Sequence, residues 1–168
     1  MLLTVAPTPR LELPPLGPAH AEEMAAVLAD PALYAFTGGT PYGVEELRAR
    51  YARLAAGSPD PAVGWVNRVL RLRADGRLAG YVQATVTDGG RTAEVAWVVG
   101  TPWQGRGLAA EAATALVGAL ADAGAELVVA HVHPEHRASE RVAAAAGLHP
   151  TDRVHDGERR WEAPLSAR

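Results

Sequence analysis

Cysteine is absent from the 168 residues, and this absence removes several classes of protein at once. Without thiols the chain has no disulfide framework, no thiolate metal site and no cysteine nucleophile. An enzyme that stores an acyl group as a thioester on its own side chain is therefore excluded.

An excess of positive charge is also missing, because the formal net charge is −3. Nucleic-acid binders present a concentrated basic surface, so we expect a small molecule or a protein as partner and no nucleic acid. No apolar run approaches the roughly 20 residues that span a bilayer, and the first residues lack the basic segment of a signal peptide. We expect a cytoplasmic protein without membrane contact, and the length predicts a single domain over residues 1–168.

A helix cap is the third absence. Residues 97–111 read as an apolar strand, a glycine-rich turn and the start of a helix. Most helices satisfy their first N–H groups with Ser, Thr, Asp or Asn, but none of these lies between Trp103 and Ala109. Gly105 and Gly107 let a ligand approach the backbone, and Arg106 adds positive charge at the positive end of the helix dipole. The sequence predicts that these free donors bind an anion, most simply a phosphate.

Hydrophobic periodicity and turn residues predict the order of strands and helices. We expect a short edge strand that begins at Arg10 and stops at the prolines that follow. Further strands are expected at 66–73, 77–87, 92–99, 126–132, 148–154 and 160–165, and helices at 18–30, 44–56, 108–124 and 137–146. The strand, helix and strand between residues 94 and 132 favour a right-handed parallel crossover.

With these elements in place, Gln104-Gly105-Arg106-Gly107-Leu108-Ala109 resembles the pyrophosphate-binding signature of GNAT-type N-acetyltransferases: Gln or Arg, two residues, Gly, one residue, then Gly or Ala. The element order is similar to that family over nearly the whole chain. The opening Arg10-Leu-Glu-Leu and the late Ser139 resemble the branch that acetylates protein N-termini, those of ribosomal proteins included. The resemblance implies an α/β (α+β sandwich) GNAT acyl-CoA N-acyltransferase fold, with a mixed central sheet of six to seven strands and about four helices.

The resemblance also implies the ligands and where they bind. Acetyl-CoA is the donor, the acceptor is a primary amine of a protein N-terminus or a small molecule, and no metal takes part. The backbone of Gln104, Gly105, Arg106, Gly107, Leu108 and Ala109 holds the pyrophosphate. The pantetheine arm lies against the main chain near Val98 and Val99, so the strand at 126–132 must diverge from the one at 92–99. The family often forms homodimers.

Two side chains are candidates for the acid and base chemistry. Glu94 shares a strand face with Ala96 and Val98, which places it beside the expected reaction centre as a base; the alternative is a solvated or ion-paired strand carboxylate. Ser139 resembles the serine that the branch places near the CoA sulfur; the alternative is a serine that bonds local backbone groups. Two residues depart from the family pattern: His136 stands where Asn more often contacts the pantetheine, and Ala143 where many members have a Tyr acid.

Other interpretations remain open at this point. Gly105 to Ala110 also fits the weak dinucleotide fingerprint G-x-G-x-x-A of a nicotinamide oxidoreductase, or a glycine turn needed only for packing. His131 and His133 share a strand face, and with His136 they could contact ligand, hold a metal or lie at the surface. Arg48, Arg50 and Arg53 form either a solvated helix face or one wall of an acceptor cleft. The two departures from the family pattern leave room for a non-catalytic acyl-CoA sensor or scaffold of the same fold.

Overall fold

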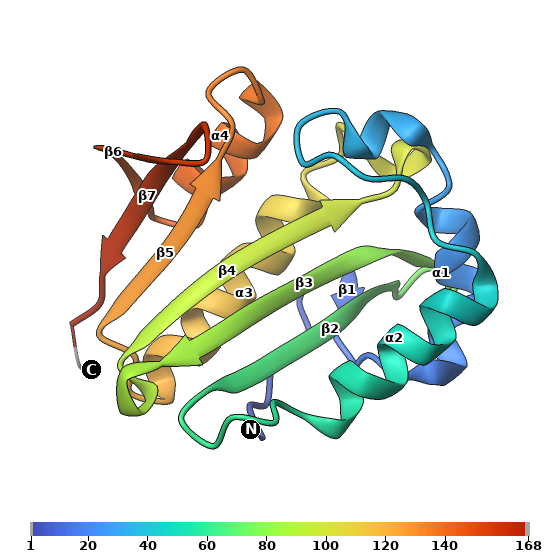
Figure 1. The fold of residues 1–168 in the computed structure, drawn as a ribbon, viewed down its shortest axis with the longest axis horizontal. Coiled ribbons are helices and arrows are strands. Elements are labelled where there is room, and N and C mark those ends of the chain that lie inside the picture. Colours follow the sequence, from blue (N-terminus) through green and yellow to red (C-terminus); the bar gives the residue numbers. More distant parts are fainter. Residues whose placement is uncertain (1, 167–168) are drawn as a thin grey trace.

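A seven-stranded sheet with the order β1-β2-β3-β4-β5-β7-β6 forms the centre of the computed structural model, which describes residues 2–166 (Figure 1). The strands are β1 (Leu11–Glu12), β2 (Gly64–Leu72), β3 (Leu78–Thr87), β4 (Thr92–Val99), β5 (Leu127–Val132), β6 (His149–His155) and β7 (Glu158–Pro164). Neighbours pair antiparallel except β4 and β5, which are parallel. The predicted mixed sheet and its strand number are confirmed.

Four α-helices flank the sheet: α1 (Ala21–Val27), α2 (Val44–Ala56), α3 (Leu108–Asp122) and α4 (Arg137–Ala145). Short 3-10 turns are η1 (Pro18–His20), η2 (Pro31–Tyr34), η3 (Asp88–Gly90) and η4 (Thr101–Trp103). In Figure 1, α3 runs behind the strands while α2 lies on the opposite side, beyond β2. Four apolar residues at four-residue intervals in α3 form one helix face, and all are buried: Leu108, Ala112, Leu116 and Leu120.

The first strand is short and ends before the prolines, as its pattern predicted. Only Leu11 and Glu12 pair regularly with β2, because the prolines that follow have no N–H to donate. The segment nevertheless continues along β2, where the Pro14 carbonyl accepts from Val69 and the Leu16 N–H donates to Asn67. Proline thus converts the end of this edge strand into an irregular but attached segment.

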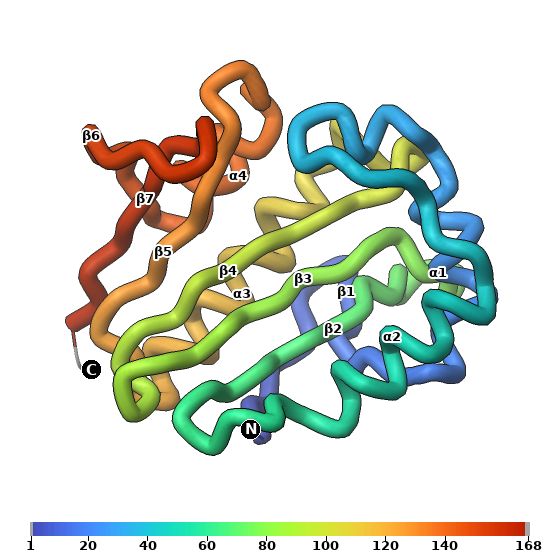
Figure 2. Tube along the Cα trace, viewed as in Figure 1, coloured from blue at the N-terminus to red at the C-terminus, as the bar shows by residue number. Residues whose placement is uncertain are grey.

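The two central strands β4 and β5 run together only at their beginnings. Register pairs join Thr92 to Leu127, Ala93 to Val128 and Glu94 to Val129, and none follows. Beyond that point the chains separate, and Figure 2 shows the widening gap between them. This confirms the expected divergence and leaves one side of the second half of β4 without a strand partner.

None of the helices within residues 2–166 combines the length and the apolar character that a membrane span requires.

Candidate active site

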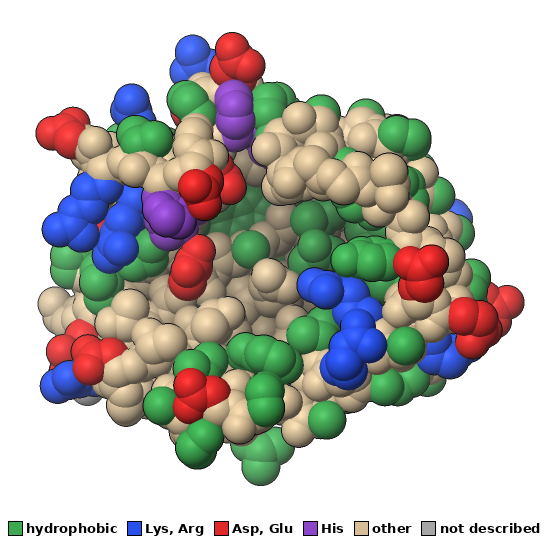
Figure 3. Space-filling view, viewed as in Figure 1, with side chains coloured by type: hydrophobic (Ala, Val, Ile, Leu, Met, Phe, Trp, Pro, Cys, Tyr) green, Lys and Arg blue, Asp and Glu red, His purple; other side chains and the backbone are tan. Residues whose placement is uncertain are grey.

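A cleft of about 760 Å³ opens where β4 and β5 separate. Tyr81, Gln83 and Ala96 line it from the sheet, and the glycine turn before α3 and the side chains of α4 line it from beyond the strand ends. In the space-filling view the same region is a hollow, with acidic and histidine side chains along one rim and basic side chains on the opposite wall (Figure 3).

The glycine turn holds the start of α3 open toward this cleft. Gly105 and Gly107 both have φ +75°, a left-handed conformation that favours glycine, and α3 has no side-chain cap. Within residues 2–166 the N–H groups of residues 105–110 have no backbone acceptor. Gln104 differs, because its N–H donates to the Thr101 carbonyl over 3.3 Å. The N–H groups without a backbone acceptor therefore begin at Gly105, whereas the Gln104 N–H already has a partner.

The Gln104 side chain instead fixes the turn to the end of β4. Its Nε2 donates to the Val99 carbonyl over 3.0 Å, which orients the strand end and the turn relative to each other.

Arg10, from the edge of the sheet, supports the same turn from behind. Its Nη1 donates to the Arg106 carbonyl over 2.7 Å, and its Nε lies 3.1 Å from Glu111 Oε1. Burial opposes ionisation of Glu111, but hydrogen bonds from Thr8 and Arg10 outweigh it and lower the pKa of this carboxyl. Sequence reasoning missed this support because about 100 residues separate the partners.

Every second residue in the last part of β4 directs its main-chain groups into the gap between β4 and β5. The Gly100 N–H donates to the Ala79 carbonyl, and antiparallel bonds alternate along a ladder. Main-chain groups of Val98 therefore point to β3, whereas those of Trp97 and Val99 point into the gap. Of the two predicted positions only Val99 directs its backbone there, although Val98 also lines the cleft.

Glu94 and His131 meet where the gap begins. Glu94 is the last residue of β4 that pairs with β5, and its Oε1 lies 2.8 Å from His131 Nδ1. The side chain of Glu94 is 57% exposed, that of His131 is 21% exposed, and both line the cleft. A neutral His131 that donates from Nδ1 to the carboxylate has Nε2 free as a proton acceptor. The sequence predicted the strand face of Glu94 correctly. It did not predict that His131 is the partner of this carboxylate.

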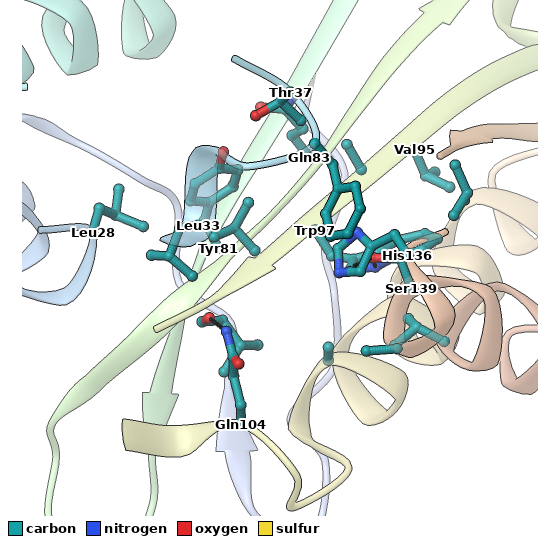
Figure 4. A pocket seen from close by; sticks show the side chains of 18 of the residues that line it. Leu28, Leu33, Thr37, Tyr81, Gln83, Val95, Trp97, Gln104, His136 and Ser139 are labelled. Carbon is teal, nitrogen blue, oxygen red and sulfur yellow. Dashed lines mark hydrogen bonds between the residues drawn. The ribbon is translucent and has the colours of Figure 1, made fainter. Parts of the chain in front are cut away.

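Ser139, Trp97 and His136 form a short polar chain on the α4 side of the cleft (Figure 4). Trp97 Nε1 donates to Ser139 Oγ over 3.3 Å, and His136 Nε2 lies 3.4 Å from the same oxygen. Burial, with a smaller effect of neighbouring His133, lowers the pKa of His136, which favours the neutral ring. The tautomer of that ring decides whether Nε2 donates to or accepts from the hydroxyl. In the part of the chain that the structure describes, the Ser139 hydroxyl contacts these side chains and no backbone group.

An aromatic stack joins the start of α4 to the loop that follows η2. The Phe36 ring lies 4.5 Å from the His136 ring at an interplanar angle of 12°, and 5.0 Å from that of His133. Nothing in the sequence pattern indicated this contact, because both histidines follow β5 and Phe36 follows η2.

Two other expectations concern α4 and the histidines. Ala143 is fully buried and does not line the cleft, whereas Val142 does, so the position compared with the family's Tyr is directed to the core. His131 and His133 serve different contacts, since His133 Nδ1 accepts the Glu135 N–H. No three metal-ligating side chains converge anywhere in residues 2–166.

Comparison with known proteins agrees with this geometry. The family described as "Acetyltransferase (GNAT) domain" matches residues 10–149. A GNAT-family acetyltransferase from Bacillus anthracis has 18% identity and a TM-score of 0.78, covering 98% of each chain. A ribosomal-protein alpha-N-acetyltransferase solved with coenzyme A has 16% identity and a TM-score of 0.81, covering 98% of this chain and 99% of its own. Curated protein sequences gave no significant match.

A microcin self-immunity acetyltransferase in complex with acetyl-CoA and AMP has 13% identity and a TM-score of 0.79, covering 97% of this chain and 98% of its own. At these identities the solved structures establish the shared fold. The family match, which covers most of the chain, carries the assignment. With its glycine turn and its parted strands, the chain belongs to the GNAT acetyltransferase family.

Proposed function

We propose that this chain transfers an acetyl group from acetyl-CoA to a primary amine by direct attack while both substrates are bound. The observation that carries the proposal is the set of unpartnered N–H groups at residues 105–110, which open into a cleft between two parted parallel strands. A diphosphate is the ligand that such a helix start favours.

The second half of β4 is suited to an amide-bearing chain such as pantetheine. Trp97 and Val99 direct backbone groups into the gap, and a linear ligand can bond them as an added strand would. His136 and Ser139 lie on the opposite side of this gap, where we propose that they contact the arm near its sulfur.

The attacking amine loses its proton to the Glu94–His131 pair, which lies where β4 and β5 begin to separate. Acetyl-CoA supplies a thioester carbonyl; a C–N bond to the amine forms there as the C–S bond breaks. We assign the proton of the attacking nitrogen to His131 Nε2, with Glu94 holding the ring and stabilising its charged form. Glu94 is thereby a positioning residue for the base, which refines its predicted role.

Ser139 provides the donor for the departing thiolate. Its oxygen already accepts from Trp97, so its own proton remains for a second partner. Holding the amine and the thioester together contributes most of the rate, because alignment alone supplies about 7–11 kcal/mol.

Two measurements test the proposal. Calorimetry should show saturable binding of acetyl-CoA, and a panel of amines, N-terminal peptides included, should release CoA thiol. Absence of binding to both CoA and acetyl-CoA refutes the proposal. Binding without thiol release from any amine identifies the sensor instead. A change of NADH fluorescence on mixing would support the oxidoreductase.

A further inference from the structure

One wall of the cleft carries an arginine that its own helix does not neutralise. Arg50 of α2 lines the cleft, and its guanidinium carbon lies 5.6 Å from the centre of the Tyr42 ring. Glu46 stands four residues earlier, the favourable orientation for a helical ion pair. Yet among the described residues no carboxylate pairs with Arg50, whereas neighbouring Arg48 pairs with Glu45. The Arg50 side chain is directed to the cleft instead.

Two further tyrosines line the same cleft. Tyr51, one position along α2, is only 3% exposed, lines the cleft and has a buried hydroxyl without a hydrogen-bond partner in the described chain. Tyr81 lines the cleft from β3 (Figure 4). Burial raises the pKa of both tyrosines and Arg50 lowers it by less, so both hydroxyls remain protonated. The Tyr51 hydroxyl is buried, which leaves Tyr81 as the donor for a ligand in the cleft.

The floor beside them adds two amides. Asn67 of β2 and Gln83 of β3 are register partners and line the cleft. Their side chains have no hydrogen-bond partner within residues 2–166. The α2 side of the cleft therefore combines one cation with several neutral donors.

Carboxylates stand on the opposite rim, and Arg141 of α4 also lines the cleft. Glu94 and Glu158 line the cleft there, beside His131, and Figure 3 shows acidic and basic side chains on facing sides of the hollow. An acceptor whose amine attacks near Glu94 and whose far end carries an anion matches the charges on both sides of the cleft. The volume of about 760 Å³ must also admit the thioester arm, which leaves space for a small molecule.

We infer that the acceptor is a small amine with a carboxylate at its far end, and that Arg50 selects it with the Tyr81 hydroxyl. A planar guanidinium matches the two oxygens of a carboxylate, and a single cation balances its single charge. This inference rests on the proposed function, because it assigns the acceptor side of the same cleft.

The test compares acceptors and variants in the thiol-release assay. Unbranched ω-amino acids of increasing length are paired with alkylamines of equal length. We expect the best amino acid to exceed its matched amine about 10- to 100-fold in kcat/KM, the factor for a charge-assisted contact. Arg50→Ala should abolish this preference by raising KM with little change in kcat, and Arg50→Lys should restore part of it. Arg53→Ala is the matched control, since Arg53 does not line the cleft.

Several results overturn the inference. Equal preference in the wild type and Arg50→Ala, or the same loss in Arg53→Ala, excludes Arg50 as the selecting residue. A stronger preference for aminoalkyl phosphonates excludes the carboxylate. If no acceptor releases thiol, calorimetry on the CoA-loaded protein decides, and absence of ω-amino acid binding refutes the inference. The affinity of wild type and Arg50→Ala for acetyl-CoA, which should be equal, reports separately on the proposed function.

Discussion

Replacing Gly105 by alanine separates the role of the glycine turn in binding from its role in folding. An alanine Cβ at this position meets no atom within 4 Å, so the folded protein without ligand has no clash to relieve. The strain of an L-residue at φ +75° costs about 1–2 kcal/mol. Reduced freedom of the unfolded chain offsets about 0.4–1 kcal/mol of this cost. The melting temperature should therefore fall by only a few degrees.

The effect on ligand binding should be larger. Gly105 lines the cleft, so the added methyl group occupies space beside the N–H groups that we assign to the diphosphate. Losing one hydrogen bond to a charged oxygen costs about 1.5–3 kcal/mol, which corresponds to a roughly 10- to 150-fold weaker Kd for CoA. Titration calorimetry measures this directly, and thermal unfolding of the same samples measures the stability.

Gly147→Ala provides the matched control. Gly147 follows α4 with φ +91°, its surroundings are also open, and it does not line the cleft. We expect a similar loss of stability with unchanged affinity for CoA. Full affinity in a folded Gly105→Ala protein, or the same loss of affinity in both variants, would refute the assignment of the turn.

Three further predictions concern individual carboxylates and a hydroxyl. Glu94→Gln should lower kcat about 100-fold and change its pH profile, because His131 loses the carboxylate that stabilises its charged form; unchanged kinetics would remove Glu94 from the proposed role. Ser139→Ala should lower kcat about 10-fold with little effect on CoA affinity, and normal turnover would exclude it as thiolate donor. Glu111→Gln should cost about 1–2 kcal/mol at pH 7, since hydrogen bonds from Thr8 and Arg10 are weakened.

The pH dependence of the last variant has a defined sign. The fold lowers the pKa of Glu111, so its stabilisation is present above the pKa of the unfolded chain. That stabilisation is lost as the pH falls through the folded value. The stabilities of wild type and Glu111→Gln should thus converge in acid, as chemical denaturation at several pH values will show. A constant difference across that range would contradict the reasoning.

Local patterns predicted the elements well where one face is buried. The bounds of α2 and β4 agree with those expected, because amphipathic spacing and flanking glycines define them within a few residues. The short first strand was also predicted, but the attachment of residues beyond Glu12 depends on bonds to β2 that no local pattern encodes. The β6 strand is largely exposed and paired irregularly with β7, so hydrophobic alternation gave it little definition.

The candidate site was predictable in its backbone and less so in its side chains. The uncapped start of α3 follows directly from the residues around Gly105 and Gly107. The partner of Glu94, by contrast, depends on which residue of β5 lies beside it where pairing ends. Trp97 and Val99 direct their backbone groups into the gap because of the hydrogen bond between Gly100 and Ala79, which fixes the alternation of bonds between β3 and β4.

By itself, the sequence determined the order of elements, the glycine turn and the absence of a thiol nucleophile, because these depend on neighbours along the chain. Only the tertiary structure decided that Glu94 meets His131, that Phe36 stacks on His136, and that Arg50 faces the cleft. Such contacts join residues far apart in the chain. Their positions are set by strand register and by the point at which β4 and β5 separate, which a periodic pattern cannot specify.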